Sequence, residues 1–204
     1  MTAPQRVPDQ AQPPYAVLAV ASSAGGIRGL GVLLGGLGGD FPVPVVVVQH
    51  LDRKHRTFIA EVLARRSTLP VKLAEAGERI RPGQVYVAPP DRHLLVGACG
   101  TVRLSFTELV HFVRPSADLL FASVAESYGS RALACVLTGT GVDGAEGVVR
   151  VKGVGGTVLA EDPASAEFDG MPSAAVATGA VDRVLPLEDL AAELRALVGA
   201  AAAT

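Results

Sequence analysis

Residues 43–50 have the sequence VPVVVVQH, in which four β-branched side chains, Val45 to Val48, follow one another without a polar break. A strand with one face in water alternates apolar and polar residues, so an unbroken run indicates a strand buried on both faces. Such strands occur mainly in parallel sheets that are covered by helices on both sides. We therefore predict an α/β protein.

Segments of strand length alternate with segments of helical periodicity on both sides of this run. The expected strands are 15–21, 43–49, 132–137, 157–160 and 181–185, and the expected helices are 27–37, 56–66, 116–128, one from 145, one after 171–172, and 187–198. Three short runs, 84–88, 92–96 and 102–106, are separated by Pro and Gly turns and predict an antiparallel flap. The expected fold class is a doubly wound, mostly parallel sheet with helices on both faces and a small antiparallel hairpin insertion.

Composition limits the classes of function that the chain can have. Of its 204 residues, 49% are hydrophobic and 19% are charged, which is typical of a globular protein. The net charge of −2 provides no field that would attract nucleic acid or anionic lipid, and no apolar run reaches the ~18 residues of a membrane span. We expect one domain at 15–198, a disordered lead-in at 1–14 and a frayed tail at 199–204.

The two cysteines, Cys99 and Cys135, lie far apart in a chain that is large enough to fold without a covalent link. They are expected to be buried free thiols. Free thiols are typical of a reducing compartment, so we expect a cytoplasmic protein.

In a parallel sheet the functional site lies beyond the carboxyl ends of the strands. The first predicted strand ends in Ala21-Ser22-Ser23-Ala24-Gly25-Gly26 and leads into a helix. Centred on Ser23, this resembles a nucleophile elbow, a turn that exposes a hydroxyl above the sheet. The alternative is that one of the serines only caps the helix, since serine is a preferred N-cap residue.

The second strand ends in Gln49-His50, which places a histidine at the same edge as Ser23. His50 is a candidate general base, with a rim histidine bonded to backbone as the alternative. The other histidines, His55, His93 and His111, are expected to have surface or structural roles. No metal-ligand spacing occurs in the sequence, so neither a metal site nor a cofactor is expected.

The third strand ends in the sequence TGTGVDG at 138–144, which allows two interpretations. Gly139, Gly141 and Gly144 form the G-x-G-x-x-G of a dinucleotide-binding loop, with Glu161 following the next strand. Asp143 speaks against this, because a carboxylate would lie where a pyrophosphate must bind. The other interpretation is that Asp143 accepts a hydrogen bond from Nδ1–H of His50 and completes a Ser-His-Asp triad for acyl transfer.

At these motifs the chain resembles the catalytic domain of the chemotaxis receptor methylesterases, the CheB-type protein-glutamate methylesterases. The resemblance rests on residues 21–26 and 48–50, on RPSAD at 114–118, on LTGTGVDG at 137–144 and on GMPSAA at 170–175, which follow one another in family order. It assigns the family's serine, histidine and aspartate to Ser23, His50 and Asp143. Ala21, Ser22 and Ala24 depart from the family's elbow, and Thr140 and Val142 depart from its glycine loop.

The resemblance implies a serine hydrolase that demethylates glutamate γ-methyl esters on chemoreceptors, with deamidation of glutamine as a related activity. Backbone N–H groups of Ala24 and Thr140 are the expected donors to the oxyanion, and no cofactor is implied. Arg53 and Arg56, just past His50, are candidates for contact with the receptor, with a solvated basic start of the next helix as the alternative. A receptor-binding descendant of the family without activity is the alternative, because the elbow is altered.

The resemblance also implies protein partners, whereas the charge and the lack of a long apolar run speak against nucleic acid and membrane insertion. The substrate would be a methylated chemoreceptor. Fourteen lead-in residues are too few for a receiver domain, so control by phosphorylation would require a separate receiver protein. Residues 51–55 resemble the branch of the family that is fused to a receptor methyltransferase, which makes a separate methyltransferase a second possible partner.

Overall fold

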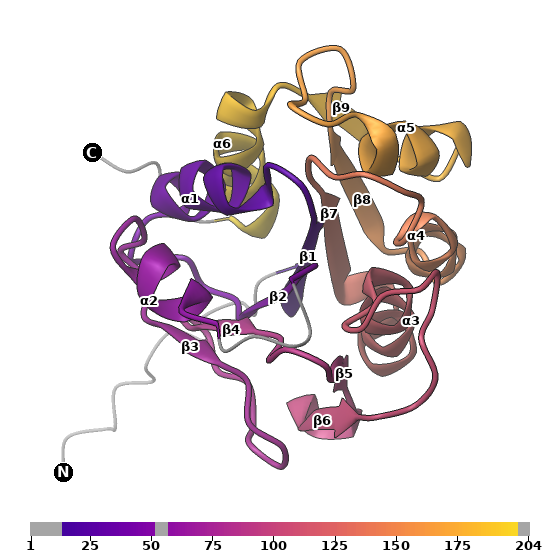
Figure 1. Cartoon of the computed structure of the whole chain (residues 1–204). Helices are drawn as coiled ribbons and strands as arrows, with labels where there is room; N and C mark the ends of the chain where they lie inside the picture. Colours follow the sequence, from indigo (N-terminus) through magenta and orange to yellow (C-terminus); the bar gives the residue numbers. More distant parts are fainter. Residues whose placement is uncertain (1–13, 52–56, 200–204) are drawn as a thin grey trace, which may run out of the picture.

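The parallel sheet predicted from the valine run forms the central layer of the computed structural model, which describes residues 14–51 and 57–199 (Figure 1). Its strands are β1 (Val17–Ser22), β2 (Val45–Gln49), β3 (Val71–Leu73), β4 (Val85–Val87), β7 (Ala132–Val136), β8 (Thr157–Glu161) and β9 (Arg183–Leu185). Within the described residues they form a seven-stranded sheet in the order β3-β4-β2-β1-β7-β8-β9, with all neighbours parallel. The predicted fold class is confirmed.

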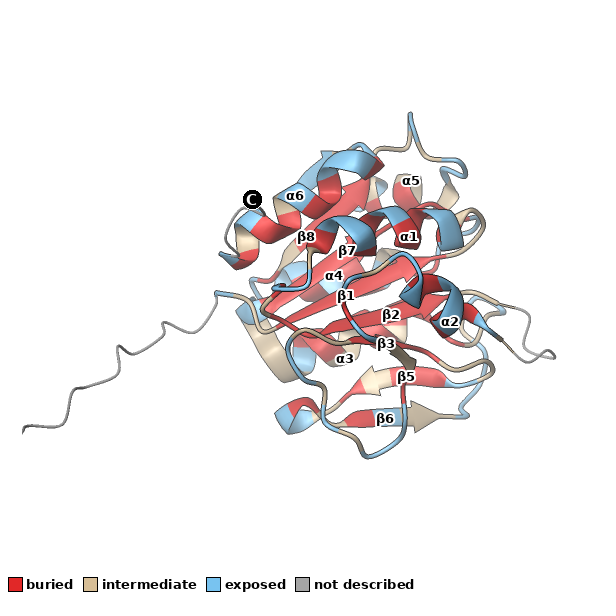
Figure 2. Cartoon of the chain, turned by 90° about the vertical axis from the view of Figure 1, so that its left-hand side faces the viewer, coloured by how far each residue is buried: buried red, intermediate tan, exposed pale blue. Residues whose placement is uncertain are grey.

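Helices cover both faces of the sheet, as Figure 2 shows. The helices are α1 (Gly26–Leu37), α2 (Ile59–Ala64), α3 (Ala117–Tyr128), α4 (Ala145–Gly153), α5 (Gly170–Ala177) and α6 (Leu187–Val198), with 3₁₀ turns at Ala98–Gly100 and Gly129–Arg131. Successive side chains of a strand point to opposite faces, so Leu18 and Val20 pack with α1, α2 and α6, whereas Ala19 packs with α3, α4 and α5. The two apolar cores therefore share one sheet.

The expected antiparallel flap is smaller than predicted. β5 (His93–Val96) and β6 (Val102–Ser105) form an antiparallel hairpin, but β4, predicted as its third strand, pairs in parallel with β2 and β3. The sequence was misleading here because β4 is only three residues long and a proline turn links it to the hairpin.

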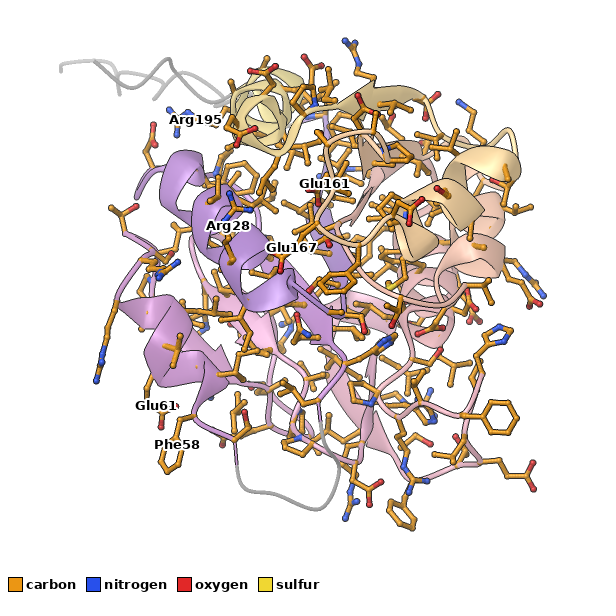
Figure 3. All side chains as sticks on the ribbon, turned by 45° about the horizontal axis from the view of Figure 1, so that its top comes forward. Arg28, Phe58, Glu61, Glu161, Glu167 and Arg195 are labelled. Atoms are coloured by element: carbon orange, nitrogen blue, oxygen red, sulfur yellow. The ribbon has the colours of Figure 1, made fainter. Side chains whose placement is uncertain are left out.

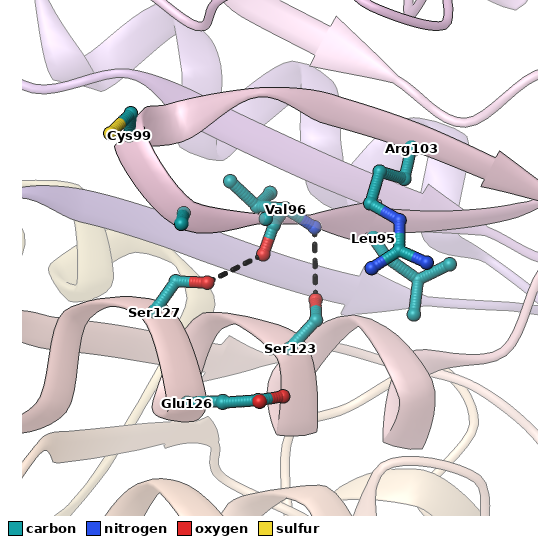
Figure 4. Close-up of a pocket in the computed structure, with 9 residues that line it drawn as sticks. Leu95, Val96, Cys99, Arg103, Ser123, Glu126 and Ser127 are labelled. Atoms are coloured by element: carbon teal, nitrogen blue, oxygen red, sulfur yellow. Dashed lines mark hydrogen bonds between the residues drawn. The ribbon is translucent and has the colours of Figure 1, made fainter.

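Hydrogen bonds attach the hairpin to α3. Ser123 Oγ accepts a hydrogen bond from the backbone N–H of Val96, and Ser127 Oγ donates one to its carbonyl (Figure 4). Both polar groups on the free edge of β5 at Val96 are thereby satisfied by α3, which attaches the hairpin to this helix.

Two smaller predictions also change. The helix expected at 56–66 is confined to Ile59–Ala64 in the described residues, and β3 was not predicted at all. Both cysteines are free, as expected, but only Cys135 is buried, whereas Cys99 is exposed at the tip of the hairpin.

Within the described ranges, no helix has the length and apolar character that crossing a bilayer demands.

Close contact between α3 and α4 depends on Gly147. A Cβ atom at this position would lie 2.7 Å from the Cβ of Phe121 and 3.0 Å from the Cα of Asp118, which is closer than side chains pack. A Cβ at Gly153 in the same helix would meet nothing within 4 Å.

We expect Gly147→Ala to lower the free energy of unfolding by about 1–3 kcal/mol, because overpacking forces the two helices apart. Gly153→Ala should leave stability unchanged or slightly raised, since alanine has the higher helix propensity. Urea denaturation of both variants measures the difference. Equal stability of the two would contradict the packing of α3 on α4.

Candidate active site

Three strand ends meet at one edge of the sheet because β1 lies between β2 and β7. Ser23 follows β1, His50 follows β2, and Asp143 lies in the loop after β7. All three line a cavity of about 320 Å³, together with His111, Phe112, Val113, Thr140, Gly141 and Val142. The structure therefore brings together the three residues that the sequence placed at strand ends.

The turn after β1 exposes Ser23 without using it as a helix cap. The N-cap of α1 is Gly25, in the left-handed region at φ 74°, and no side chain caps this helix. The backbone N–H of Ser23 donates a hydrogen bond to the carbonyl oxygen of Thr138, just after β7, which fixes the turn against that strand. Among the described residues, the Ser23 hydroxyl has no hydrogen-bond partner, so it is available to a substrate.

Gly139 lets the loop after β7 approach this serine closely. A Cβ atom at Gly139 would lie 2.8 Å from the Cβ of Ser23 and 2.4 Å from the Sδ of Met171. Any larger residue would push the loop away from Ser23.

The side chain of Gln49 links the ends of β1 and β2 by hydrogen bonds. Its buried side chain accepts a hydrogen bond from Ser22 Oγ (2.7 Å) and donates to the carbonyls of Ser23 (2.7 Å) and His50 (2.9 Å). Gly26 leaves room for this amide, since a Cβ there would lie 2.1 Å from Gln49 Oε1. One side chain thus holds the backbone of both candidate catalytic residues.

His50 and Asp143 are joined by a hydrogen bond of 2.8 Å. The contact uses Nε2 of His50, so the prediction that Nδ1 would face the carboxylate was wrong. The reason is reach: His50 ends β2 and the loop with Asp143 follows β7, with β1 between them, so the distal ring nitrogen makes the contact. Nδ1 is then the nitrogen left to exchange a proton with a substrate or nucleophile.

The carboxylate of Asp143 is buried at the N-terminus of α3. It accepts hydrogen bonds from Ser116 Oγ (2.8 Å) and from the backbone N–H groups of Ala117 (2.6 Å) and Asp118 (3.2 Å). Burial raises the pKa of this carboxyl group, but the hydrogen bonds from His50, Ala117 and Ser116 outweigh burial and hold the pKa below its ordinary value. Asp143 is therefore kept ionised by His50 and, to a smaller extent, by the N-terminal end of α3.

Asp118 makes the reciprocal contact with α4. Its Oδ1 accepts hydrogen bonds from the backbone N–H groups of Gly144 (2.9 Å) and Gly147 (2.7 Å), and its Oδ2 lies 3.2 Å from His111 Nε2. Burial, with a smaller effect from the neighbouring charge of Asp143, raises the pKa of Asp118 to about 6. The N-terminus of α3 is thus occupied by Asp143, from the loop before α4, and the N-terminus of α4 is occupied by Asp118, from α3.

This arrangement excludes the dinucleotide interpretation of Gly139, Gly141 and Gly144. A pyrophosphate would need the N–H groups at the start of α4, and Asp118 already occupies them. Glu161, the expected ribose ligand, instead accepts a hydrogen bond from the backbone N–H of Thr138.

The expected oxyanion donors also border the site. Thr140 lines the cavity described above, and Ala24 lines an adjoining cavity of about 480 Å³ that also contains Ser23 and His50. Neither backbone N–H forms a hydrogen bond with a described residue, so both can donate to a substrate. Arg28 and Glu167, which are labelled in Figure 3, also line the adjoining cavity.

The remaining predicted residues have mixed outcomes. Arg53, Arg56 and His55 lie outside the described residues. His93 is structural, as expected: its Nδ1 accepts from the N–H of Ser116 and its Nε2 donates to the carbonyl of Glu108. His111, for which the same role was expected, borders the cavity. Within the described ranges, no group of three His, Cys, Asp or Glu side chains could hold a metal ion.

Sequence reasoning missed three positioning residues, Gln49, Ser116 and Asp118. A signal existed for each of them. Gln49 is a polar residue within a strand that is otherwise buried, and such a residue needs internal partners. Ser116 followed two residues later by Asp118 is the pattern of a helix N-terminus, where carboxylates and caps gather.

Comparisons with known proteins match most of the chain. The family model described as CheB methylesterase matches residues 18–194. The protein-glutamate methylesterase/protein-glutamine glutaminase 2 of Anaeromyxobacter dehalogenans is 45% identical over 181 residues, which are 89% of this chain and 53% of that protein. A similar protein from Myxococcus xanthus, numbered 4, is 45% identical over 87% of this chain and 50% of its own length. The chain thus spans about half the length of these curated relatives.

A solved structure matches as well. The crystal structure of the Thermotoga maritima CheB methylesterase catalytic domain superimposes with a TM-score of 0.86 at 40% identity, and the match covers 90% of this chain and 99% of that one. The extra length of the two curated relatives therefore lies outside the part that corresponds to this fold.

Ionisation of Asp118 gives the site a measurable pH signature. Its raised pKa means that the folded chain binds more protons than the unfolded chain between about pH 4 and 6, so this group's contribution to stability falls as the pH rises through that window. Asp118→Asn cannot ionise and keeps an oxygen for both N–H groups of α4. We expect the variant to gain stability relative to wild type by as much as about 3 kcal/mol between pH 4 and 7. Urea denaturation across this range measures the difference, and a constant difference would contradict the assignment.

Proposed function

The chain belongs to the CheB methylesterase family, and from this membership we propose that it is a protein-glutamate methylesterase, with protein-glutamine deamidation as a second activity. The observation that carries the proposal is the meeting of Ser23, His50 and Asp143 around one cavity. The residues that meet there are those that a serine hydrolase uses: a free hydroxyl, a histidine that lines the same cavity, and a buried carboxylate that is hydrogen-bonded to the histidine. Residues 15–198 form the proposed catalytic domain.

The first half of the reaction forms an acyl-enzyme. Nδ1 of His50 takes the proton from Ser23 as the hydroxyl oxygen attacks the γ-carbonyl carbon of the methylated glutamate. The negative charge that develops on the carbonyl oxygen is stabilised by the N–H groups of Ala24 and Thr140. The tetrahedral intermediate then expels methoxide, which takes the proton from His50 and leaves as methanol.

The second half regenerates the enzyme. Water gives a proton to His50 and attacks the acyl-enzyme, and the new tetrahedral intermediate releases Ser23, which recovers the proton. The product is the glutamate side chain. With a glutamine substrate the leaving group is ammonia and the other steps are the same.

Asp143 has a positioning and electrostatic role in this scheme. Its hydrogen bond to Nε2 keeps a proton on that nitrogen, so the lone pair of His50 is on Nδ1, and its charge stabilises the imidazolium that forms. Because the hydrogen bonds from His50 and from the start of α3 hold this carboxylate ionised, the charge is present before the substrate binds.

The proposed substrate is a methylated chemoreceptor. Arg53 and Arg56 are proposed to contact the receptor, and a separate receiver or methyltransferase protein is proposed as the regulating partner.

We expect Ser23→Ala to abolish methanol release from a methylated chemoreceptor and to leave the fold intact, since the hydroxyl makes no hydrogen bond with a described residue. Asp143→Asn should lower kcat by about 10³–10⁴, because the amide does not enforce the required tautomer. Ser130→Ala, an exposed serine at the other end of the sheet, is the matched control and should retain full activity. Release of methanol is measured by gas chromatography, with circular dichroism to verify folding.

Two outcomes would overturn the proposal. Unchanged methanol release by Ser23→Ala would exclude this serine as the nucleophile. Binding of the receptor by the folded wild-type protein without any methanol release would favour the alternative, a receptor-binding member of the family without activity.

A further inference from the structure

A tight turn beside the nucleophile presents an exposed aromatic ring. Val110 and Val113 exchange both backbone hydrogen bonds, Val110 N–H to Val113 O at 3.2 Å and Val113 N–H to Val110 O at 2.9 Å. The two residues between them, His111 and Phe112, have φ values of 48° and 64°. Such turns normally use Asn and Gly at these positions, and a bulky residue there is an outlier.

The turn is held in place from three sides. Nε2 of His93 donates to the carbonyl of Glu108, and Arg114 binds both the carbonyl of Thr107 and the carboxylate of Asp91. Nε2 of His111 lies 3.2 Å from Oδ2 of the buried Asp118, an oxygen that has no hydrogen-bond partner among the described residues. These contacts fix the turn to the same α3 N-terminus that holds Asp143, so its position relative to the active site is set by the fold.

Despite this support, the side chain of Phe112 is 92% exposed. The ring thus gains almost nothing from folding, and the backbone beneath it is strained. An exposed, strained position that the surrounding structure enforces is typical of a functional site.

Phe112 is also part of a longer apolar surface. It lines the cavity with Ser23, His50 and Val142, whose side chain is 50% exposed. Ile27, 41% exposed, lines the adjoining cavity, and Ser23 and His50 border both. Exposed apolar groups therefore lie on both sides of the nucleophile.

We propose that Phe112 is a substrate-docking residue that contacts apolar side chains of the methyl-accepting segment of a chemoreceptor next to the modified glutamate. The inference rests on the proposed function, because only a substrate attached to a protein brings a surface that must lie across the active-site opening. The occupant is apolar rather than acidic at this point, because the turn offers an aromatic ring and valine side chains. Aromatic residues are the commonest anchors of protein interfaces.

The strained backbone supplies a variant that separates docking from folding. Phe112→Gly removes the ring and places at this φ the residue that tolerates it best, so the variant should be at least as stable as wild type. Phe112→Leu keeps an apolar side chain of similar reach. Val184→Ala removes exposed apolar surface on β9 and is the control outside the site.

The test compares two substrates with each variant: a carboxyl-methylated chemoreceptor and the small ester p-nitrophenyl acetate. We expect Phe112→Gly to raise KM for the receptor at least tenfold and to change kcat/KM for the small ester less than threefold. Phe112→Leu should raise the receptor KM less than threefold, and Val184→Ala should resemble wild type. Binding of the receptor to Ser23→Ala, with and without Phe112→Gly, gives the same comparison without turnover, and the loss of affinity should again be at least tenfold.

The outcomes separate this inference from the function on which it rests. A receptor that wild type and Phe112→Gly demethylate with equal KM would overturn the docking role alone. A wild-type protein that releases no methanol from the receptor would overturn the proposed function and the docking role with it. A parallel loss of activity on both substrates would show that Phe112 acts on the catalytic residues rather than on docking, and would also overturn the inference.

Discussion

Two buried carboxylates, Asp118 and Asp143, connect α3 and α4 at the end of the sheet where the cavity lies. The connection is a reciprocal exchange of hydrogen bonds, in which each carboxylate accepts from the N–H groups at the start of one of the two helices. Asp143 precedes α4 and accepts the N–H groups that begin α3, whereas Asp118 lies in α3 and accepts the N–H groups that begin α4. A buried carboxylate without such donors would be costly, so each helix makes the burial of the other's acid possible. The distance between α3 and α4 is therefore fixed by hydrogen bonds as well as by the packing of Gly147 against Phe121.

The position of the candidate catalytic residues follows from this exchange. β7 and α4 place Asp143 near the sheet edge, α3 aims and ionises its carboxylate, and that carboxylate then orients His50, which arrives from the other side of β1. Gln49 adds a second constraint, because its amide group donates hydrogen bonds to the backbone carbonyls of both Ser23 and His50. The hydroxyl of Ser23 is left without a described partner, while the groups around it are fixed. That combination is what preorganised catalysis requires.

The sequence was sufficient for those features that depend on strand periodicity. Val45 to Val48 predicted a strand buried on both faces, and the parallel sheet that follows from it brought Ser23, His50 and Asp143 to one edge. The bounds of α6 were also predicted correctly, because an apolar stripe and a terminal glycine mark them. Three-residue strands such as β3 and β4 are too short to show a period, and their place in the sheet is decided by contacts between distant segments. The same limit applies to Ser116 and Asp118, which act on residues more than 25 positions away.

The turn at Phe112 illustrates how a protein can depart from local rules where its function requires it. Local propensity favours glycine or asparagine at both central positions, and burial favours moving the aromatic ring inside. The hydrogen bonds of His93 and Arg114, with Asp118 close to His111, nevertheless hold the opposite arrangement. Each of these three residues also belongs to the framework around the start of α3. The strained turn and the active-site carboxylate therefore depend on one set of contacts, so a shift of α3 that displaced Asp143 would displace the exposed ring as well. Catalysis and recognition of a protein substrate would in this way be aligned by the same helix.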